Sequence, residues 1–346
     1  MTKTDVLKLL KNTNDYISGQ MLCEEFGVSR TAIWKVINQL KEDGYEIESV
    51  SNKGYKIINS PDIIKDYEIE SNKEFSDGFI AKVEYFDEID STNNEAKRQG
   101  DDYNSEPRLF ITESQTGGRG RRGRKWVSPK GNGIWMSLLF KPDIMPSQAS
   151  MLTIVAAMAV AAAIKDLLPE ADCKIKWPND IVINERKVCG ILTEMSAELE
   201  YIHYVVIGIG INVNTTEFPD EIKDIAASIY SLTGVKVNRS QLVVAFSKEF
   251  KKFYDIFMVK KDLGDLVNDY DKMLINKGRE VSTTGAVAIE GKAVGINSLG
   301  ELIIKTKDGA LESVRAGEVS VRGLYSYVWW ECCFMCFKFI WKKILF

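Results

Sequence analysis

The residues with the clearest chemical potential form one short basic stretch. From Arg119 to Lys125, five of seven residues are Arg or Lys, and the other two are glycine. Guanidinium groups grip phosphate or carboxylate oxygens through paired hydrogen bonds, and glycine lets the backbone approach a ligand closely. Because neighbouring cations repel, we expect the loop to be mobile when empty and ordered around a phosphate-bearing ligand. An RGG-like nucleic-acid tract or a solvated basic turn is the alternative.

A further lysine lies within an apolar segment, where burial of its charge is unfavourable. Lys176 is embedded in the apolar run that ends at Ile183, and it is followed by a Trp-Pro bend, Asn179 and Asp180. A buried ammonium group is unfavourable unless it meets an anion. The sequence therefore predicts a second cation at an anion-binding site.

Hydroxyl and amide side chains occur at the start of a predicted helix. Asp90-Ser-Thr-Asn93 precedes a helix that we expect to end near Arg98. These side chains either cap the helix or join its free N–H groups in binding a polar ligand. Gly208 and Gly210 lie inside the apolar strand predicted over 205–213, which indicates a close backbone approach there.

Composition limits the possible functions. With 346 residues and 45% hydrophobic residues, we expect two or three globular domains. A net charge of −4 argues against binding nucleic acid over the whole surface. The one histidine, His203, makes most His-based metal sites and Ser-His triads untenable. Isolated cysteines and the absence of a signal-peptide pattern predict reduced thiols and a cytoplasmic location.

The first 60 residues read as a winged helix-turn-helix. Helices are predicted over 4–11, 19–26 and 30–43, and a hairpin over 45–58. The expected DNA-contacting residues lie around the second and third helices and at the wing tip, and they are Gly19, Ser29, Arg30, Thr31, Trp34, Lys35 and Lys53. Eight Lys and Arg balance eight Asp and Glu in this region, so we expect weak DNA binding by a monomer and a need for a dimer. A winged helix used for protein contact is the alternative.

The rest of the chain divides into further units. We expect a polar linker over 61–78, a mixed α/β catalytic domain over 79–274 and a small β-barrel over 275–327. The apolar helix predicted over 147–168 is interpreted as a core helix rather than a membrane span. The aromatic and cysteine-rich segment 328–346 matches nothing upstream and is interpreted as a non-functional extension.

Three motifs in one order give a family resemblance. Gly118–Trp126, Lys176–Asp180 and Arg186–Ile191, together with Asp90–Asn93, resemble bifunctional biotin–protein ligases that also repress biotin genes. The resemblance covers residues 1 to about 327 and implies an α+β multidomain protein. Its parts would be a winged helix, a catalytic domain similar to class II synthetases and an SH3-like barrel.

The resemblance also implies a two-step reaction and residue roles. Biotin and MgATP would form biotinyl-5′-AMP, and the biotinyl group would pass to a lysine of a carrier domain. The residues implied to bind biotin are Ser91, Thr92, Asn93, Gln115, Arg119, Gly120, Arg121 and Lys176. Those implied to bind the adenylate are Trp126, Asn179 and Lys187, and the catalytic cations would be Lys176, Arg121 and Lys187.

Physical chemistry supports cations at this site. A carboxylate attacking the α-phosphate brings two anions together, and charge builds up on the phosphoryl oxygens. No protein metal site is predicted; Mg²⁺ would arrive with ATP, with Asp180 as a candidate contact. The expected partners are a biotin carboxyl carrier domain, operator DNA and, with adenylate bound, a second copy of the chain, with no membrane partner. A lipoate-type ligase and a ligand-responsive repressor without catalysis are the alternatives.

Overall fold

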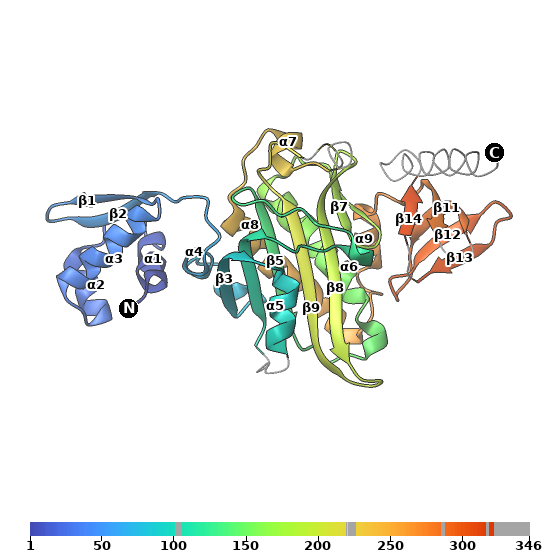
Figure 1. Cartoon of the computed structure of the whole chain (residues 1–346), viewed down its shortest axis with the longest axis horizontal. Coiled ribbons are helices and arrows are strands. Elements are labelled where there is room, and N and C mark those ends of the chain that lie inside the picture. The colour runs from blue at the N-terminus through green and yellow to red at the C-terminus, as the bar shows by residue number, and fades with distance from the viewer. Residues whose placement is uncertain (101–105, 219, 221–225, 285–287, 316–317, 322–346) are drawn as a thin grey trace, which may run out of the picture.

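Three units follow one another along the long axis of the molecule (Figure 1). The computed structural model describes residues 1–346 except 101–105, 219, 221–225, 285–287, 316–317 and 322–346. The extension predicted over 328–346 and the last residues expected in the barrel, 322–327, therefore lie outside the described residues.

The N-terminal unit has the predicted winged-helix order. Its elements are α1 (Lys3–Lys11), α2 (Gly19–Phe26), α3 (Arg30–Glu42), β1 (Glu46–Val50) and β2 (Gly54–Asn59). Ser18 and Ser29 cap α2 and α3, because their hydroxyls accept hydrogen bonds from Met21 N at 3.0 Å and Ala32 N at 3.3 Å. Leu7, Leu22, Ile33 and Ile37 are buried in a separate hydrophobic core.

The segment after the winged helix is more ordered than its polar composition suggests. It contains α4 (Asp66–Glu70) and the 3₁₀ turn η1 (Phe75–Asp77). Ile64 and Ile69 are fully buried in the core of the central domain. This segment has too few apolar side chains for the sequence to predict a helix. Tertiary packing nevertheless stabilises a helix that is five residues long.

A seven-stranded mixed sheet organises the central domain. Only the β3–β4 pair is parallel, and the other pairs are antiparallel. The strands follow in the order β3 (Lys82–Ile89), β4 (Arg108–Gln115), β5 (Gly133–Phe140), β9 (Ile202–Asn212), β8 (Arg186–Ala197), β7 (Asp180–Ile183) and β6 (Cys173–Lys176). The apolar run around Lys176 therefore forms two short strands, β6 and β7, joined by a turn.

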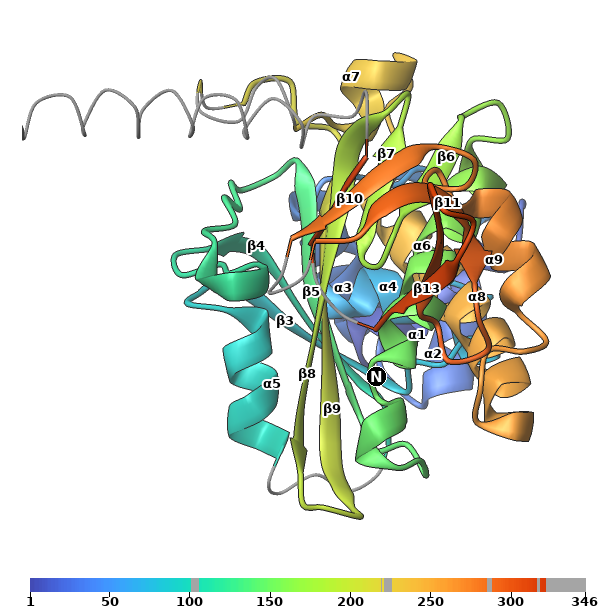
Figure 2. The same cartoon turned by 90° about the vertical axis from the view of Figure 1, so that its right-hand side faces the viewer.

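Helices cover the two faces of this sheet differently (Figure 2). α5 (Thr92–Gly100) lies on one face, and α6 (Met151–Leu167) and α8 (Arg239–Lys260) lie on the other. The short helices α7 (Ile229–Thr233) and α9 (Val267–Met273) complete the domain. Among the described residues, one stretch, Pro146–Leu167, is long and apolar enough to cross a membrane, and 72% of its most apolar window is buried inside the domain. It matches the expected core helix.

In the C-terminal unit, where a small β-barrel is predicted, the described residues form a small antiparallel sheet. Its five strands follow in the order β13 (Leu311–Val314), β12 (Leu302–Thr306), β11 (Glu290–Ile296), β10 (Glu280–Thr284) and β14 (Glu318–Val321). The Nε1 of Trp177 donates a hydrogen bond to the carbonyl of Gly300 at 2.9 Å, so this unit contacts the turn that follows Lys176.

Candidate functional site

One row of residues crosses four strands of the central sheet and ends at Lys176. Gly210 of β9 pairs with Gly190 of β8, Gly190 pairs with Asp180 of β7, and Asp180 pairs with Lys176 of β6. Trp135 of β5 pairs with Gly210 from the other side. Directly paired residues point to the same face of a sheet. The sheet therefore places Lys176, which is 7% exposed, on the same face as two glycines distant in sequence.

Glycines on this face leave space for other side chains. A Cβ on Gly210 would lie 2.6 Å from Nε1 of Trp126, and one on Gly190 would lie 3.0 Å from the same indole ring. A Cβ on Gly208 would lie 2.1 Å from Oδ1 of Asn93. The close approach predicted from Gly208 and Gly210 is confirmed, because larger residues would collide with Asn93 and Trp126.

Polar side chains from α5, β4 and β5 form a connected network beside the glycines. Thr92 donates to Oε1 of Gln115 from its backbone N at 2.9 Å and from its hydroxyl at 3.2 Å. Nε2 of Gln115 donates to the hydroxyl of Ser128 at 2.9 Å. The hydroxyl of Ser137 lies 2.7 Å from Oγ1 of Thr92 and 2.5 Å from Oδ1 of Asn93. Such a network can orient a neutral polar ring that approaches the sheet.

A carboxylate continues this network toward the basic loop. Nδ2 of Asn93 and Nζ of Lys97 donate to Glu194 at 2.7 Å and 2.9 Å. Burial raises the pKa of Glu194, but these hydrogen bonds and the charges of Lys97 and Arg119 outweigh it, so the net pKa is lowered. Glu194 is therefore ionised at neutral pH and holds Asn93 in place.

The basic loop closes on itself in a compact turn. Gly120 N donates to the carbonyl of Arg124 at 2.7 Å, and Trp126 N donates to the carbonyl of Gly118 at 2.9 Å. The backbones of Arg119 and Lys125 form an isolated β-bridge. This conformation directs the indole of Trp126 onto Gly190 and Gly210, which we call the glycine floor. The expectation that the loop is mobile without ligand stays a prediction.

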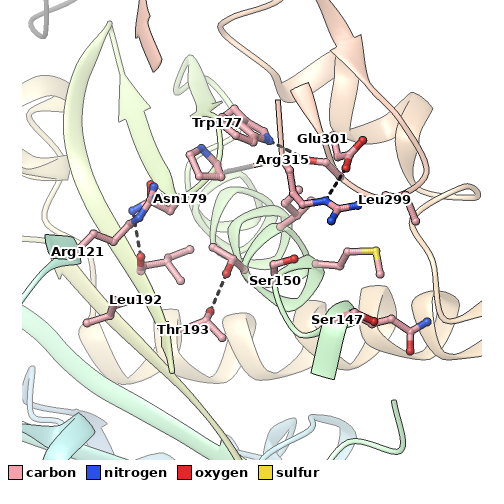
Figure 3. A pocket seen from close by; sticks show the side chains of 17 residues that line it. Arg121, Ser147, Ser150, Trp177, Asn179, Leu192, Thr193, Leu299, Glu301 and Arg315 are labelled. Atoms are coloured by element: carbon pink, nitrogen blue, oxygen red, sulfur yellow. Dashed lines mark hydrogen bonds and ion pairs between the residues drawn. The ribbon is translucent and has the colours of Figure 1, made fainter. Parts of the chain in front are cut away.

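Arg121 connects the loop to the edge of the sheet. Its Nη1 donates to Oδ1 of Asn179 at 2.8 Å, and Nδ2 of Asn179 donates to the carbonyl of Ile191 at 3.0 Å. Figure 3 shows this pair at the rim of a cavity of about 490 Å³ that extends between α6 and the C-terminal sheet. Thr193, Ser150, Glu301 and Arg315 are among the cavity's lining residues. The glycine floor and Thr92 do not line this cavity, so the cavity adjoins the candidate site without containing it.

Lys187 lies at the other end of the glycine floor. Its Nζ forms an ion pair with Oδ1 of Asp180 at 2.6 Å and lies 5.4 Å from the centre of the Trp126 ring. Nε1 of Trp126 is buried and has no hydrogen-bond partner. Within the described ranges, no group of three His, Cys, Asp or Glu side chains could hold a metal ion.

The structure gathers most of the predicted small-molecule residues on one face. Thr92, Asn93 and Gln115 share the polar network, and buried Ser91 precedes them at the start of α5. Arg119 and Gly120 belong to the loop beside it, and Arg121 turns toward Asn179 instead. Sequence reasoning missed the network residues Ser128, Ser137, Glu194 and Lys97. Only their side-chain contacts in the folded protein identify them.

The predicted DNA-contacting residues gather on the winged helix. Ser29, Arg30, Thr31, Trp34 and Lys35 are exposed at the start of α3, and Trp34 is 59% exposed. Lys53 is exposed in the turn between β1 and β2, with its Nζ 5.6 Å from the ring centre of Tyr16. Gly19 is half-buried at the first position of α2, against Tyr55.

Comparison with known proteins agrees with this three-unit arrangement. Residues 2–56 match the model of an HTH domain, residues 85–212 that of the biotin/lipoate A/B protein ligase family, and residues 278–322 that of the biotin protein ligase C-terminal domain. The three matches correspond to the winged helix, the central sheet and the small C-terminal sheet.

Full-length relatives and a solved structure give the same result. The chain is 38% identical to the bifunctional ligase/repressor BirA of Bacillus subtilis over 312 residues, which cover 89% of this chain and 95% of that protein. It is 28% identical to the Escherichia coli protein of the same name over 92% of this chain and 96% of that one. The structure is similar to a biotin protein ligase from Aquifex aeolicus in complex with biotin and ATP, with a TM-score of 0.61 and 31% identity, covering 70% of this chain and 99% of that one. The chain therefore belongs to the family of bifunctional biotin–protein ligases and repressors.

Proposed function

We propose that this protein activates biotin with ATP to biotinyl-5′-AMP, transfers the biotinyl group to a carrier-protein lysine and represses transcription when the adenylate is bound. The observation that carries the proposal is the set of polar and charged side chains on the α5 face of the sheet, here called the small-molecule site. There the hydrogen-bonding network around Thr92 and Gln115 adjoins a glycine floor, with Lys176 and Lys187 at its far end.

Each part of the small-molecule site suits one part of the ligand. Biotin's ring system is neutral and polar at one edge, so the Ser91, Thr92, Asn93 and Gln115 groups would bind it. The glycine floor accommodates a flat ring, and Trp126 would stack beside the adenine. Asn179 would shape the adenylate side through its contacts with Arg121 and the Ile191 carbonyl.

The cations would lower the barrier of the first step. The biotin carboxylate attacks the α-phosphorus of ATP, an O–P bond forms, and the bond to the leaving pyrophosphate breaks. Lys176 would stabilise the carboxylate and the acyl-phosphate oxygens, and Lys187 the phosphates. Arg119, Gly120 and Arg121 would cover the product. In the second step a neutral carrier lysine attacks the acyl carbon, AMP leaves, and the amine loses a proton.

Mg²⁺ would enter as part of the nucleotide substrate. It favours oxygen ligands and keeps several waters, so triphosphate oxygens supply most of its coordination. Asp180 is already paired with Lys187 at 2.6 Å, so any contact between Asp180 and the ion would compete with that pair.

Pyrophosphate release tests the ligase proposal directly. Purified protein with MgATP is given biotin, lipoate or no acid. We expect release with biotin alone, and release with lipoate alone would support the alternative of a lipoate-type ligase. Transfer of labelled biotin to a carrier domain then separates the ligase from a repressor without catalysis, which would bind biotin and transfer none.

Regulation would require a dimer that forms along the free edge of β8. Residues 186–190 of β8 pair with β7, whereas Leu192–Ala197 pair with β9 alone among the residues described. An unpaired strand edge can accept a second strand. Arg121 and Asn179 lie beside this edge, so ligand that orders the basic loop would favour pairing there. A twofold dimer would present two α3 helices to successive turns of the major groove.

Operator titrations test the regulatory half of the proposal. Binding is measured against protein concentration with apo, biotin-bound and adenylate-bound protein, and the oligomeric state is followed by sedimentation. We expect the adenylate to shift both the operator-binding curve and the dimerisation curve to lower protein concentration. Equal curves in all three states would mean that the two activities share a chain without a switch. A cytoplasmic setting suits both activities, and Cys23, Cys173 and Cys189 are free thiols as that setting requires.

A further inference from the structure

The winged helix and the central domain meet around one buried carboxylate. Glu68 of α4 is 4% exposed. Its Oε2 accepts hydrogen bonds from Nζ of Lys11 at 2.7 Å and from the hydroxyl of Tyr45, and its Oε1 lies 3.3 Å from the hydroxyl of Ser240, which it shares as a donor with Oδ1 of Asn238 at 2.8 Å. Lys11 belongs to α1, Tyr45 lies between α3 and β1, and Ser240 belongs to α8. One side chain thus joins both domains, and Figure 1 shows α4 between them.

The charges around Glu68 depend on one another. Burial lowers the pKa of Lys11, and the charge of Glu68 opposes this. Burial and the nearby Glu68 raise the pKa of Tyr45, so its hydroxyl stays protonated and donates. Lys11 also donates to the hydroxyl of Ser71 at 2.9 Å. Breaking a buried ion pair by neutralising one partner leaves the other charge uncompensated, which is strongly unfavourable.

The apolar contacts on the two sides of this carboxylate belong to different cores. Ile64 and Ile69 pack into the core of the central domain, whereas Ile63 and Tyr67 pack against the core of the winged helix. Each domain therefore has its own core, and polar contacts connect them, including the pair of Lys65 and Asp43 at 2.8 Å. Apolar contacts limit orientation poorly, whereas directional hydrogen bonds to a buried carboxylate can fix it.

The same end of α8 also holds the chain that enters α4. Arg239, which is 2% exposed, donates to the carboxylate of Asp62 from Nε at 3.2 Å and to the carbonyl of Asp62 from Nη2 at 2.9 Å. Its Nη1 donates to Glu113 of β4 at 2.9 Å. Glu113 in turn accepts a hydrogen bond from Gly131 N at 3.1 Å, where the chain returns from the basic loop. The junction is thus anchored to the strand that carries Gln115.

We propose that Glu68 is a positioning residue for DNA recognition: it fixes the orientation of the winged helix on α8, and with it the relative placement of the two recognition helices in a dimer. The proposal rests on the proposed repressor function. Two α3 helices can enter successive major grooves only at a defined separation. A winged helix that turns freely loses orientational entropy on binding, and affinity falls accordingly.

The test compares Glu68→Gln with wild-type full-length protein in two measurements. One is the distance distribution between spin labels at Glu42 in α3 and Val259 in α8, in a background with Cys23, Cys332, Cys333 and Cys336 changed to Ser. The other is operator affinity with adenylate bound. We expect a broadened distance distribution and an operator dissociation constant higher by about 10-fold or more. Adenylate synthesis should be unchanged, because the partners of Glu68 are Lys11, Tyr45, Ser71 and Ser240, none of which belongs to the small-molecule site.

Two further variants make the test specific. Glu74→Gln is the matched control, since Glu74 also pairs with α8, through Lys248 at 3.2 Å, but both side chains are exposed. It should change neither measurement. The pair Lys11→Met with Glu68→Gln removes both buried charges but does not restore the carboxylate, so we expect the distance distribution to stay broad; a narrow distribution would show that only the uncompensated charge of Lys11 matters.

An unchanged distance distribution and unchanged operator affinity in Glu68→Gln would overturn the proposal. The distance measurement needs no DNA, so it tests whether Glu68 fixes the orientation of the winged helix even if the wild-type protein fails to bind an operator. Failure of the wild-type protein to bind an operator would instead contradict the repressor function itself.

Discussion

The two faces of the central sheet differ in what they bury. The face toward α6 and α8 is almost entirely apolar, with Phe246, Phe250 and Phe257 fully buried and Phe79 and Phe140 in edge contact with the Phe250 ring. The face toward α5 carries glycines, hydroxyls and charges, including Lys176 and Glu194, beside a small apolar cluster around Phe110 and Val206. Alternate residues of the same strands supply both faces.

This difference separates stability from binding within one sheet. Ile209 of β9 belongs to the hydrophobic core, whereas its neighbours Gly208 and Gly210 meet Asn93 and Trp126. Substitutions on the apolar face should therefore change the free energy of unfolding and leave ligand binding intact. Substitutions on the polar face should do the reverse, and variants on the two faces can be paired to test the separation.

The largest effect is expected on the apolar face. Phe250→Ala should lower the free energy of unfolding of the central domain by about 3–5 kcal/mol, because it removes a fully buried ring and leaves a cavity. Denaturant unfolding followed by tryptophan fluorescence measures it. Val259→Ala on the same helix, where Val259 is 78% exposed, should change stability little. A loss of biotin affinity in folded Phe250→Ala protein would contradict the separation of the faces.

Lys176→Ala should produce the largest effect on the polar face. We expect adenylate formation to fall by about 10²–10³-fold with the fold intact, since one transition-state charge stabiliser is lost. Single-turnover pyrophosphate release measures the rate. Lys174→Ala is the control, because Lys174 lies two residues earlier on β6 and its Nζ contacts Asp172 and the Lys272 carbonyl. A rate within threefold of wild type would refute the assigned role.

Gly210→Ala tests whether the glycine floor is required. The new methyl group would lie 2.6 Å from Nε1 of Trp126, so the indole must move. We expect the KM for ATP to rise by about 10-fold, as for a typical overpacking cost. Ile209→Val, one residue away and facing the core, should leave KM unchanged. Equal kinetics in Gly210→Ala and wild type would place the adenine elsewhere.

Arg121→Gly should weaken retention of the adenylate. A charged hydrogen bond lost from the covering loop corresponds to roughly 10-fold faster release. Chasing labelled adenylate with unlabelled biotin and ATP measures the off-rate. Arg122→Gly is the control in the same loop, because Arg122 is exposed with φ of 57°. The covering role fails if the two variants release adenylate at the same rate.

The smallest effect is expected from two threonines on opposite faces. Thr92→Val removes the hydroxyl that bonds Gln115 at 3.2 Å, and we expect the KM for biotin to rise by about 5-fold. Thr153→Val removes a hydroxyl contact with Thr193 at 2.8 Å on the α6 side. It should lower stability slightly and leave KM unchanged. Reversed outcomes would contradict the assignment of biotin to the α5 face.

Much of the fold could be read from local sequence signals. Ser18 and Ser29 precede their helices as caps do, and the glycines of the basic loop indicate a close approach to a ligand. The short helix α4 could not be predicted, because its five residues are stabilised by contacts with α1 and α8. Ser137 and Glu194 carry no motif, and their roles follow only from contacts with α5.

The sequence by itself determined the family, the order of the three units and the basic, hydroxyl and lysine motifs, because caps, turns and alternation act between residues close in the chain. Only the tertiary structure decided that Lys176, Asp180, Gly190 and Gly210 form one row, and that Glu68 joins Lys11 to Ser240. Both arrangements join residues far apart in the sequence. Strand register and buried charge pairing fix such contacts, and both depend on how the whole chain packs.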